Sequence, residues 1–398
     1  MSVILARTKY RGPSTLTRMS TARTDPPPGG KILVAMSGGV DSSVAAALLA
    51  RDGWEVVGCF MRLGSPGEEL DAGPVLHGDS DIRIGHKGCC SITDAADARR
   101  VAGQLDVPFY VCNFKKDFGR IIDYFVGEYN DGRTPNPCVR CNDWLKFGKL
   151  HEYARQLGAS HVASGHHARI ESVQGEPRLR MGADPGKDQS YVLFGARRQQ
   201  LGEMLLPIGG YTKDEIRSLA KELGLGVHNK PDSQEICFVP DDDYAGLVSR
   251  TTPDAIQEGE IHDLEGNVIG THRGHQHFTV GQRRGLGVSI GLPIYVVDKD
   301  AATNTVTVGP KKSLAASGCS ADEANWHVDA WDTFRPCMAK IRYNAEPIPA
   351  RVRSTGPEQI EVRFDEPQDA VAPGQAVVCY EGDLVICGGW IREAMTTA

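Results

Sequence analysis

The segment Ser37–Ser43, with the sequence Ser-Gly-Gly-Val-Asp-Ser-Ser, combines residue types that suit the binding of a phosphate group. Gly38 and Gly39 can adopt backbone angles that other residues avoid, and they let an anion approach the main chain. The serine hydroxyls add hydrogen-bond donors, whereas Asp41 would repel a phosphate, so we expect Asp41 to bind a Mg²⁺ ion that bridges to it. No Gly-Lys-Ser/Thr follows at P-loop spacing, and an ordinary strand-to-helix turn with a capping serine is the alternative.

Three cysteines form the second set of residues that could do chemistry. Cys138 and Cys141 are a Cys-x-x-Cys pair after a turn rich in proline and asparagine, and Cys237 lies in a short apolar run further along the chain. Cys141 comes just before a helix predicted at 142–157, so the helix dipole should lower the pKa of its thiol, and Arg140 should act in the same direction. We therefore expect a reactive thiolate at Cys141.

Three kinds of chemistry fit these cysteines. In the first, one cysteine carries a persulfide sulfur and another resolves it as a disulfide. In the second, Cys138, Cys141 and Cys237 hold an iron–sulfur cluster (4Fe-4S), with one iron left open for a substrate or a sulfide. A structural zinc site needs four ligands, commonly from two Cys-x-x-Cys pairs, and the chain has no second pair. We therefore rank covalent sulfur chemistry first, the cluster second and zinc third.

Predicted strands and helices alternate through the first half of the chain, which is typical of a doubly wound α/β fold with a parallel sheet. The strands are expected at 32–36, 55–61, 107–112 and 161–164. The helices are expected at 44–49, 95–105, 117–129 and 142–157. Ligands of such sheets bind at the carboxyl ends of strands, and Ser37, Met61 and Gly165 fall at three of these ends.

From about residue 241 the pattern changes to short strands separated by turns, which indicates a small central domain and an antiparallel β-barrel. One strand is expected at 338–343, where Lys340 and Arg342 alternate with apolar residues. Its basic face is either a solvated strand face or a surface that contacts phosphates and stacks a base. We expect a disordered leader at 1–29, a nucleotide-binding domain at 30–240, a central α+β domain at 241–310 and the barrel at 311–398.

Composition narrows the class of protein. The formal net charge is −7 over 398 residues, which argues against non-specific coating of nucleic acid. No apolar run approaches the ~18 residues that span a membrane, so no membrane partner is expected.

The scattered cysteines favour a reducing compartment, so we expect a cytoplasmic protein, with an organellar one as the alternative if the Arg- and Ser-rich leader 1–29 is a transit peptide. Six cysteines in apolar runs should be packed thiols: Cys59, Cys112, Cys319, Cys337, Cys379 and Cys387.

The sequence resembles the tRNA-specific 2-thiouridylase family of PP-loop ATP pyrophosphatases over nearly the whole span 31–391. The resemblance rests on eight patterns in the family's order: AMSGGVDSS (35–43), TPNPCVRCN (134–142), LKFG (145–148), ASGHHARI (163–170), DPGKDQSYVLFG (184–195), PDSQEICFVP (231–240), FTVGQRRGLG (278–287) and VAPGQAV (371–377). It implies a PP-loop ATPase domain, a small central domain and a C-terminal β-barrel. It also implies replacement of oxygen by sulfur at C2 of the wobble uridine of certain tRNAs, with ATP split to AMP and pyrophosphate.

The resemblance further implies roles for individual residues. Cys141 is the nucleophile, and Cys237 carries a persulfide from a sulfur donor or relay protein, so that a disulfide between them remains after transfer. ATP is bound by Ala35, Met36, Ser37, Gly38, Gly39, Val40, Asp41, Ser42, Met61 and Gly165. The tRNA is contacted by Asn136, Pro137, Cys138, His166, Lys187, Asp188, Gln189, Arg342, Tyr343 and Gln375. Many family members have Asp in place of Cys138, so the role of that carboxylate is not carried over, and the extra thiol strengthens the cluster alternative.

Two other functions are compatible with parts of the pattern. A small-molecule adenylating ligase of the same superfamily would need the nucleotide loop, but neither a reactive cysteine pair nor a basic barrel. A non-catalytic tRNA-binding protein with a structural metal would bind tRNA without cleaving ATP. Pyrophosphate release that depends on added tRNA distinguishes a thiolation enzyme from both.

Overall fold

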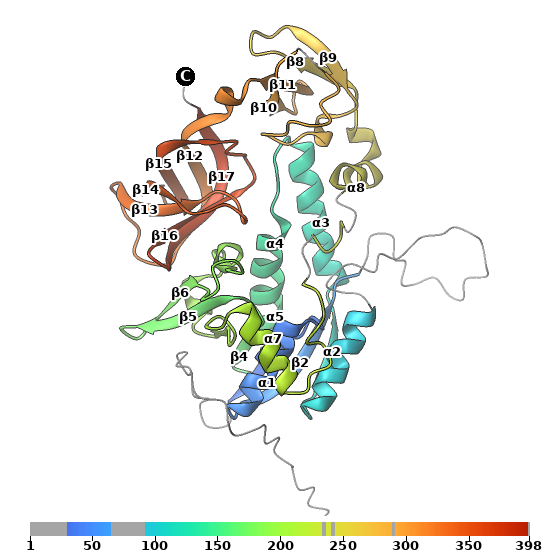
Figure 1. Ribbon diagram of the computed structural model, residues 1–398, viewed down its shortest axis with the longest axis vertical. Coiled ribbons are helices and arrows are strands. Elements are labelled where there is room, and N and C mark those ends of the chain that lie inside the picture. The colour runs from blue at the N-terminus through green and yellow to red at the C-terminus, as the bar shows by residue number, and fades with distance from the viewer. Residues whose placement is uncertain (1–29, 65–91, 233–235, 240–242, 289–290, 397–398) are drawn as a thin grey trace, which may run out of the picture. The chain divides into compact units, whose positions relative to one another are not determined.

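The computed structural model describes residues 30–64, 92–232, 236–239, 243–288 and 291–396 (Figure 1). The chain divides into two compact units, the first within 1–116, 145–190 and 199–238 and the second within 117–144, 191–198 and 239–398. The leader predicted at 1–29 lies outside the described residues. Within the described residues, no helix has both the length and the apolar character needed to cross a membrane.

A parallel five-stranded sheet forms the centre of the first unit, in the order β3-β2-β1-β4-β7. Its strands are β1 (Lys31–Ala35), β2 (Glu55–Arg62), β3 (Phe109–Asn113), β4 (His161–Ser164) and β7 (Met204–Leu205). The order runs from β1 through β2 to β3 on one side and continues with β4 on the other, so the topological switch point lies between β1 and β4. Ala35 and Ser164 are paired at the carboxyl ends of these two strands. The doubly wound α/β fold is confirmed.

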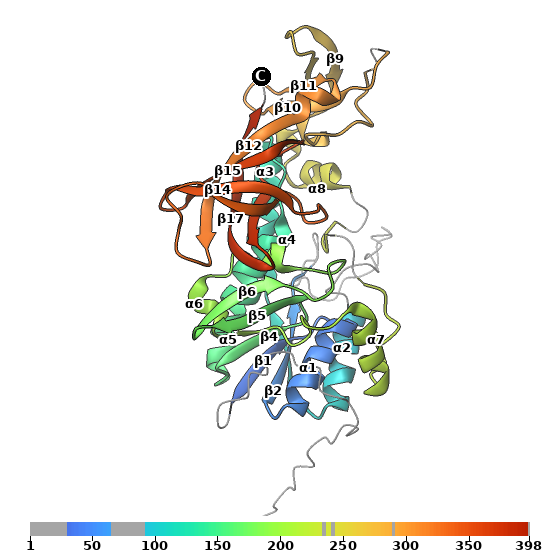
Figure 2. The same cartoon turned by 60° about the vertical axis from the view of Figure 1, so that its left-hand side comes forward.

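Helices α1 (Val40–Arg51), α2 (Ile92–Gln104) and α7 (Lys213–Glu222) pack on one face of this sheet (Figure 2). Alternate β1 residues, Ile32 and Val34, face these helices, and the small residues Ala45–Ala47 of α1 are fully buried. Small side chains let a helix approach a sheet closely, so this sequence favours tight docking of α1 beside β1. The unit also contains an antiparallel hairpin and two short helices: β5 (Ala168–Val173), β6 (Glu176–Met181), α5 (Leu150–Gln156) and α6 (Arg198–Leu201).

The second unit contains helices and a small mixed sheet in the order β10-β11-β8-β9. The helices are α3 (Lys115–Asn130), α4 (Pro137–Arg140) and α8 (Tyr244–Thr251), and α4 continues as a π-helix over Cys141–Lys149. The strands are β8 (Gly259–His262), β9 (Val268–His272), β10 (Tyr295–Asp300) and β11 (Thr305–Gly309). A core of Ile261, Phe278, Val296 and Val306 holds the sheet together.

Six antiparallel strands of the second unit close into a barrel in the order β12-β15-β14-β13-β16-β17, because β12 pairs with β15 on one side and β17 on the other. The strands are β12 (Ala315–Trp326), β13 (Arg335–Lys340), β14 (Ile348–Gly356), β15 (Gln359–Asp369), β16 (Ala376–Glu381) and β17 (Leu384–Thr396). The predicted antiparallel barrel is confirmed. The strand predicted at 338–343 ends earlier, at Lys340, so Arg342 and Tyr343 follow β13 and do not extend a basic strand face.

The six cysteines predicted to be packed thiols are all buried. Cys319, Cys337, Cys379 and Cys387 contribute to the core of the barrel. Burial raises the pKa of the Cys319 thiol to about 12. A hydrogen bond with Cys379, together with burial, raises the pKa of Cys337 far above its ordinary value. Cys319 and Cys337 therefore stay protonated at neutral pH.

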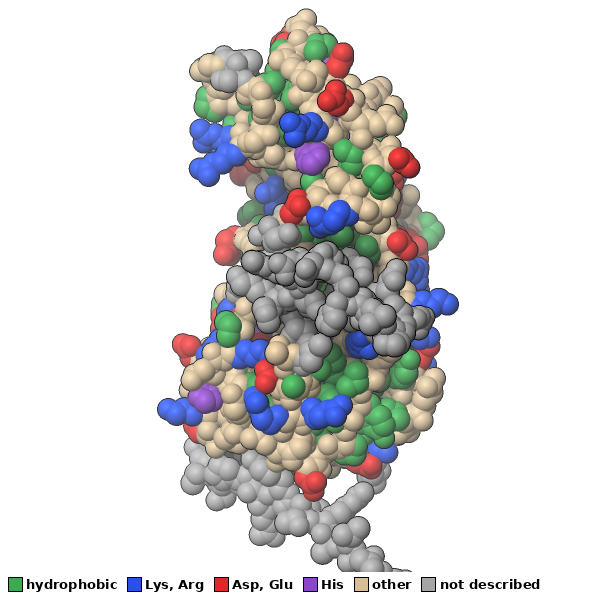
Figure 3. All heavy atoms as spheres, turned by 90° about the vertical axis from the view of Figure 1, so that its right-hand side faces the viewer, with side chains coloured by type: hydrophobic (Ala, Val, Ile, Leu, Met, Phe, Trp, Pro, Cys, Tyr) green, Lys and Arg blue, Asp and Glu red, His purple; other side chains and the backbone are tan. Residues whose placement is uncertain are grey.

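The face of the molecule drawn in Figure 3 shows Lys and Arg side chains dispersed among acidic and uncharged ones, outside the area covered by grey atoms. No continuous basic patch is visible on the described part of this face. This distribution agrees with the net charge of −7 and with local, rather than general, recognition of an anionic partner.

Candidate functional site

The glycine-rich segment after β1 is a tight turn that leads directly into α1. Gly38 has φ +76°, and a Cβ atom added there would lie 2.2 Å from the carbonyl oxygen of Asp94. A Cβ atom added at Gly165, just after β4, would lie 2.5 Å from the amide nitrogen of Ser42. Both positions therefore require glycine. They keep side chains away from the amino end of α1 at the switch point, where unpaired N–H groups favour an anion.

The serines of the turn differ in exposure and in hydrogen bonding. Ser37 is exposed, whereas Ser42 and Ser43 are buried. The Ser37 N–H donates to Ser42 Oγ at 3.1 Å, and Ser43 Oγ donates to the carbonyl oxygen of Gly39 at 2.8 Å. Ser42 and Ser43 therefore hold the turn, and Ser37 is the serine that presents its side chain to solvent.

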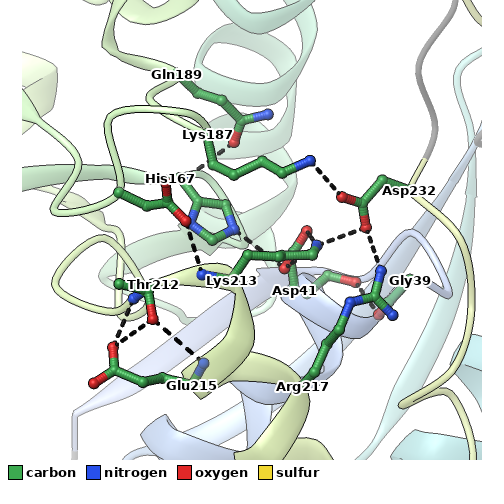
Figure 4. Close-up of polar contacts among 12 residues, drawn as sticks. Gly39, Asp41, His167, Lys187, Gln189, Thr212, Lys213, Glu215, Arg217 and Asp232 are labelled. Atoms are coloured by element: carbon green, nitrogen blue, oxygen red, sulfur yellow. Dashed lines mark hydrogen bonds and ion pairs between the residues drawn. The ribbon is translucent and has the colours of Figure 1, made fainter.

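The carboxylate of Asp41, in the first turn of α1, is held by side chains from other elements (Figure 4). Lys213 Nζ donates to both carboxylate oxygens at 2.8 Å, and His167 Nε2 lies 3.2 Å from Oδ1. Burial alone would raise the pKa of Asp41, but hydrogen bonds with His167 and Lys213 outweigh it and lower the pKa. Lys213 engages both oxygens, so a Mg²⁺ ion at Asp41 would have to displace this ammonium, and the Mg²⁺ site stays a prediction.

Lys213 also contacts a second carboxylate, that of Asp232 (Figure 4). Asp232 accepts from Lys213 at 2.7 Å, from Lys187 at 2.8 Å and from Arg217 at 3.0 Å. Burial would raise the pKa of Asp232, but its bonds to Lys187 and Lys213 lower it to about 2. Three cations thus surround this carboxylate, and one of them, Lys213, reaches the glycine turn as well.

A further lysine braces the turn from the opposite side. Lys230 Nζ donates to the carbonyl oxygen of Gly38 at 3.1 Å, to Asp94 at 2.6 Å and to Asp97 at 2.7 Å. Burial would lower the pKa of Lys230, but its bonds to the two carboxylates raise it. Because Asp94 and Asp97 belong to α2, Lys230 fixes Gly38 relative to that helix.

The other residues predicted to bind ATP lie at the ends of the two neighbouring strands. Ala35 ends β1, while Met36 and Val40 are buried on either side of the turn. Met61 is one residue from the end of β2 and is buried. The structure therefore places all the predicted ATP-binding residues in the first unit.

Four residues of the first unit were predicted to contact tRNA, and two of them are buried. His166 Nδ1 lies 2.7 Å from Ser164 Oγ, and burial lowers the pKa of His166 well below its ordinary value. Asp188 accepts from the N–H groups of Gly182 and Ser190. Direct contact of His166 or Asp188 with RNA would require them to become exposed. The other two are half-buried: Gln189 Oε1 accepts from the His167 N–H at 2.8 Å, and Lys187 pairs with Asp232.

The Cys-x-x-Cys pair lies within a helix and not before one. Asn136 caps α4, with its side chain accepting from the Val139 N–H at 3.4 Å, and Pro137 is the first helical residue. Cys138 is therefore in the first turn, where the helix dipole acts, and Cys141 begins the π-helix. Their spacing of three places both thiols on one side of the helix, with Cys138 exposed and Cys141 half-buried. The helix start predicted at 142 is wrong, because the prolines favour a helix start as well as a turn.

Arg140 is held in an aromatic cage and paired with a carboxylate of β12. Its guanidinium donates to both oxygens of Glu323 at 2.7 Å. Its Cζ lies 4.1 Å from the ring centre of Trp390, 5.0 Å from that of Tyr124 and 5.1 Å from that of Trp144. Arg140 therefore joins the thiol-bearing helix to the barrel, and its charge is balanced by Glu323 instead of standing free to stabilise a thiolate.

Gln375 supports the turn that precedes the thiol-bearing helix. Its Nε2 donates to the carbonyl oxygens of Thr134 at 3.0 Å and Pro135 at 3.2 Å. Gly374 has φ +88°, and a Cβ atom added there would lie 2.9 Å from both backbone N and O of Thr134. The backbone of the barrel loop at Gly374 thus lies close to the backbone of the turn at Thr134. This contact fixes the direction in which the chain continues from the turn into Asn136 and Pro137.

Arg342 and Tyr343 lie just beyond β13. Arg342 donates through Nη2 to the carbonyl oxygen of Ala370. Tyr343 is an exposed aromatic side chain, and its ring lies 6.2 Å from that of the buried Tyr191. An exposed aromatic ring beside an arginine is the combination that stacks and neutralises single-stranded nucleic acid.

Cys237 is half-buried and belongs to the first unit, whereas Cys138 and Cys141 belong to the second. Asp232, which precedes Cys237 closely in the sequence, is held by three cations. Among the described residues, no group of three or more His, Cys, Asp or Glu side chains is arranged to hold a metal ion.

Comparison with known proteins agrees with this architecture. Three family models match successive parts of the chain: the tRNA methyl transferase HUP domain at 30–241, the tRNA methyl transferase PRC-barrel domain at 248–310 and the aminomethyltransferase beta-barrel domain at 316–391. The chain is 47% identical over 376 residues to tRNA-specific 2-thiouridylase MnmA of Geotalea uraniireducens, covering 92% of this chain and 96% of that one. It is 46% identical over 387 residues to the MnmA protein of Rhodopirellula baltica, covering 92% and 97%.

The chain belongs to the tRNA-specific 2-thiouridylase family. The family motifs contain Asp41, Lys187 and Asp232, but sequence reasoning missed Lys213 and Lys230 as partners of the glycine turn and Arg217 as a partner of Asp232. Lys213 is 172 residues from Asp41, and its helical position gives no signal of where its ammonium lies. The sequence signal available was indirect, namely a phosphate-binding turn that lacks the usual following lysine.

Proposed function

We propose that this member of the 2-thiouridylase family catalyses ATP-dependent 2-thiolation of the wobble uridine of tRNA, releasing AMP and pyrophosphate. Family membership makes the chain a tRNA sulfurtransferase. The observation that carries the ATP-dependent step is the side-chain-free turn at the switch point, where Gly38 and Gly165 each exclude a Cβ atom. Such a turn at a helix amino terminus binds the phosphates of a nucleotide.

The first step is activation of the base. The uridine leaves its stack, because its C2 oxygen is otherwise inaccessible. That oxygen attacks the α-phosphorus of ATP, the bond between the α- and β-phosphates breaks, and the N–H groups of the glycine turn stabilise the pyrophosphate that leaves. The product is a uridine adenylated at O2, with C2 made electrophilic.

The second step transfers sulfur. The terminal sulfur of a Cys237 persulfide attacks C2, and the C2–O bond breaks as AMP leaves with the former uridine oxygen. The Cys141 thiolate then attacks Cys237 Sγ, so the S–S bond of the persulfide breaks and the sulfur stays on C2. A Cys141–Cys237 disulfide forms, which requires Cα atoms within about 7 Å, and a thiol reductant opens it. A sulfur-donor protein reloads Cys237.

In the alternative route, Cys138, Cys141 and Cys237 hold a 4Fe-4S cluster. Thiolates are the usual ligands of such clusters, and Cys138 and Cys141 share one side of a helix. An open iron would supply the binding site for the sulfur that is transferred. Cys138→Ala distinguishes the routes, because it should leave persulfide transfer active and should abolish cluster-dependent transfer. Iron analysis of anaerobically purified protein provides the second readout.

The remaining partners follow from the same proposal. The tRNA contacts Asn136, Lys187, Gln189, Arg342 and Tyr343, with the exposed Tyr343 ring as a stacking surface. We place the boundaries of the three domains at 30–240, 241–310 and 311–398, and the protein in the cytoplasm, with an organelle as the alternative if 1–29 acts as a transit peptide.

The deciding experiment measures pyrophosphate release and 2-thiouridine together, with purified tRNA, ATP and a persulfide donor. Wild-type protein should release pyrophosphate only when tRNA is present and should form one 2-thiouridine for each pyrophosphate. Cys141→Ala and Cys237→Ala should abolish 2-thiouridine while tRNA binding survives. Full activity of both variants would overturn the relay, and release of pyrophosphate driven by a small molecule in place of tRNA would favour an adenylating ligase.

A further inference from the structure

One of the lysines that contact the phosphate-binding turn comes from a distant helix. Lys213 is the first residue of α7 and is 8% exposed, yet its ammonium lies 2.8 Å from both oxygens of Asp41 in α1. Figure 4 shows this side chain extended between Asp41 and Asp232. A lysine in this place can supply the compact positive charge that the turn itself lacks.

The charges around Lys213 leave an excess of cations. Lys187, Lys213 and Arg217 surround the carboxylate of Asp232, and Lys213 alone of these three also reaches Asp41. Three cations therefore face two carboxylates. Asp232 keeps two partners if Lys213 turns away, so Lys213 can exchange one of its partners without leaving a bare buried carboxylate.

The backbone of Lys213 is fixed while the end of its side chain is not. Thr212 and Glu215 form a capping box at the start of α7, and the Lys213 N–H donates to Asp184 at 3.0 Å. The ammonium stands on a flexible stem, so it can move between oxygen acceptors without movement of the helix. Its two present acceptors are both carboxylates, whose oxygens resemble those of a phosphate in charge.

We propose that Lys213 is the phosphate-binding lysine of this site. When a nucleoside triphosphate enters the glycine turn, the Lys213 ammonium passes from Asp232, which keeps Lys187 and Arg217, to the β- and γ-phosphate oxygens and stabilises the pyrophosphate that leaves. Lys213 keeps its contact with Asp41, and this contact neutralises a carboxylate that would otherwise repel the phosphates. The inference rests on the proposed function, because it assigns a residue to the ATP that this function consumes.

The test compares ligands with and without phosphates in matched variants. Binding of α,β-methylene-ATP and of adenosine is measured by calorimetry for the wild type, Lys213→Met and Arg217→Met. Arg217 is the matched control, because it contacts Asp232 but not Asp41. Lys213→Met should weaken the triphosphate analogue about 10- to 100-fold and leave adenosine unchanged, as expected for one lost charge-assisted hydrogen bond. Arg217→Met should change the ratio of the two affinities less than about twofold.

The outcomes separate this inference from the proposed function. Equal weakening of both ligands in Lys213→Met, or no weakening, would overturn the role of Lys213. Failure of wild-type protein to bind the analogue would instead overturn the ATP-dependent function. If Lys213→Met does not fold, the double variant Lys213→Met with Asp41→Asn removes both charges together, and it should still lose the preference for the triphosphate. Lys213→Arg should restore part of that preference, since it retains the charge.

Discussion

The glycine turn and the thiol-bearing helix both depend on a cation, but they use it in opposite ways. Lys213 is shared between two carboxylates, and other cations duplicate its contact with Asp232. Arg140 has one carboxylate partner, Glu323, and three aromatic rings around it. A shared ion pair can exchange partners when a charged ligand arrives, whereas a caged one fixes a position. The first arrangement suits nucleotide binding, and the second suits precise placement of Cys138 and Cys141.

The strongest way to break the first arrangement is to fill the space that glycine leaves open. Gly38→Ala should weaken α,β-methylene-ATP by about 100-fold or more, because the new methyl group meets Asp94 and a positive φ disfavours Ala. Gly39→Ala is the control, since its added Cβ would lie 3.5 Å from Ser37 Oγ, an ordinary contact. Calorimetric titration of both variants measures the difference. Equal affinities would show that the turn does not shape the site.

The second arrangement can be tested by removing the partner of the caged arginine. Glu323→Ala leaves Arg140 buried and unpaired, so we expect a loss of about 1–3 kcal/mol in the free energy of unfolding, reduced because Glu323 is partly exposed. Urea unfolding followed by tryptophan fluorescence reports on this region, since Trp144 and Trp390 line the cage. The double variant Arg140→Met with Glu323→Gln should recover most of the loss. If the double variant is as unstable as Glu323→Ala, the loss does not come from the unpaired charge of Arg140, which would contradict this explanation.

The smallest expected effect is a pH dependence of the shared ion pairs. The pKa of Asp232 is lowered to about 2, so its contribution to stability is present above the unfolded value of about 3.9 and is lost as the pH falls from about 4 to about 2. Asp232→Asn should therefore lower the thermal midpoint at pH 7 and reduce its fall on acidification. Asp329→Asn is the control, because Asp329 is 98% exposed and pairs only at the surface. If the thermal midpoints of the wild type and Asp232→Asn fall equally as the pH is lowered from about 4 to about 2, the lowered pKa of Asp232 does not contribute to stability.

The architecture could be predicted from the sequence because local patterns determine it. Apolar strands alternating with helices predict the parallel sheet, and short strands with turns predict the barrel. The start of the thiol-bearing helix was missed, since Pro137 and its neighbours are equally typical of a turn. The strand predicted at 338–343 ends at Lys340, because the chain turns there and alternation of side chains does not reveal where pairing stops.

The site could be predicted only where its residues are contiguous. Gly38 and Asp41 belong to one motif, and their surroundings follow from a strand, a turn and a helix. The partners Lys213 and Glu323 could not be found, because they are 172 residues from Asp41 and 183 residues from Arg140. The destination of a long charged side chain depends on tertiary packing, which no local periodicity encodes.

The protonated cysteines inside the barrel have a consequence for chemical selectivity. A protein that handles sulfane sulfur exposes its own cysteines to adventitious sulfuration and to electrophiles, and thiolates are the species that react. Cys319 and Cys337 are sealed in an apolar interior that keeps their protons on. Cys319 and Cys337 are therefore unreactive at neutral pH, and under the proposed persulfide route they would not compete with Cys141 and Cys237 for sulfur.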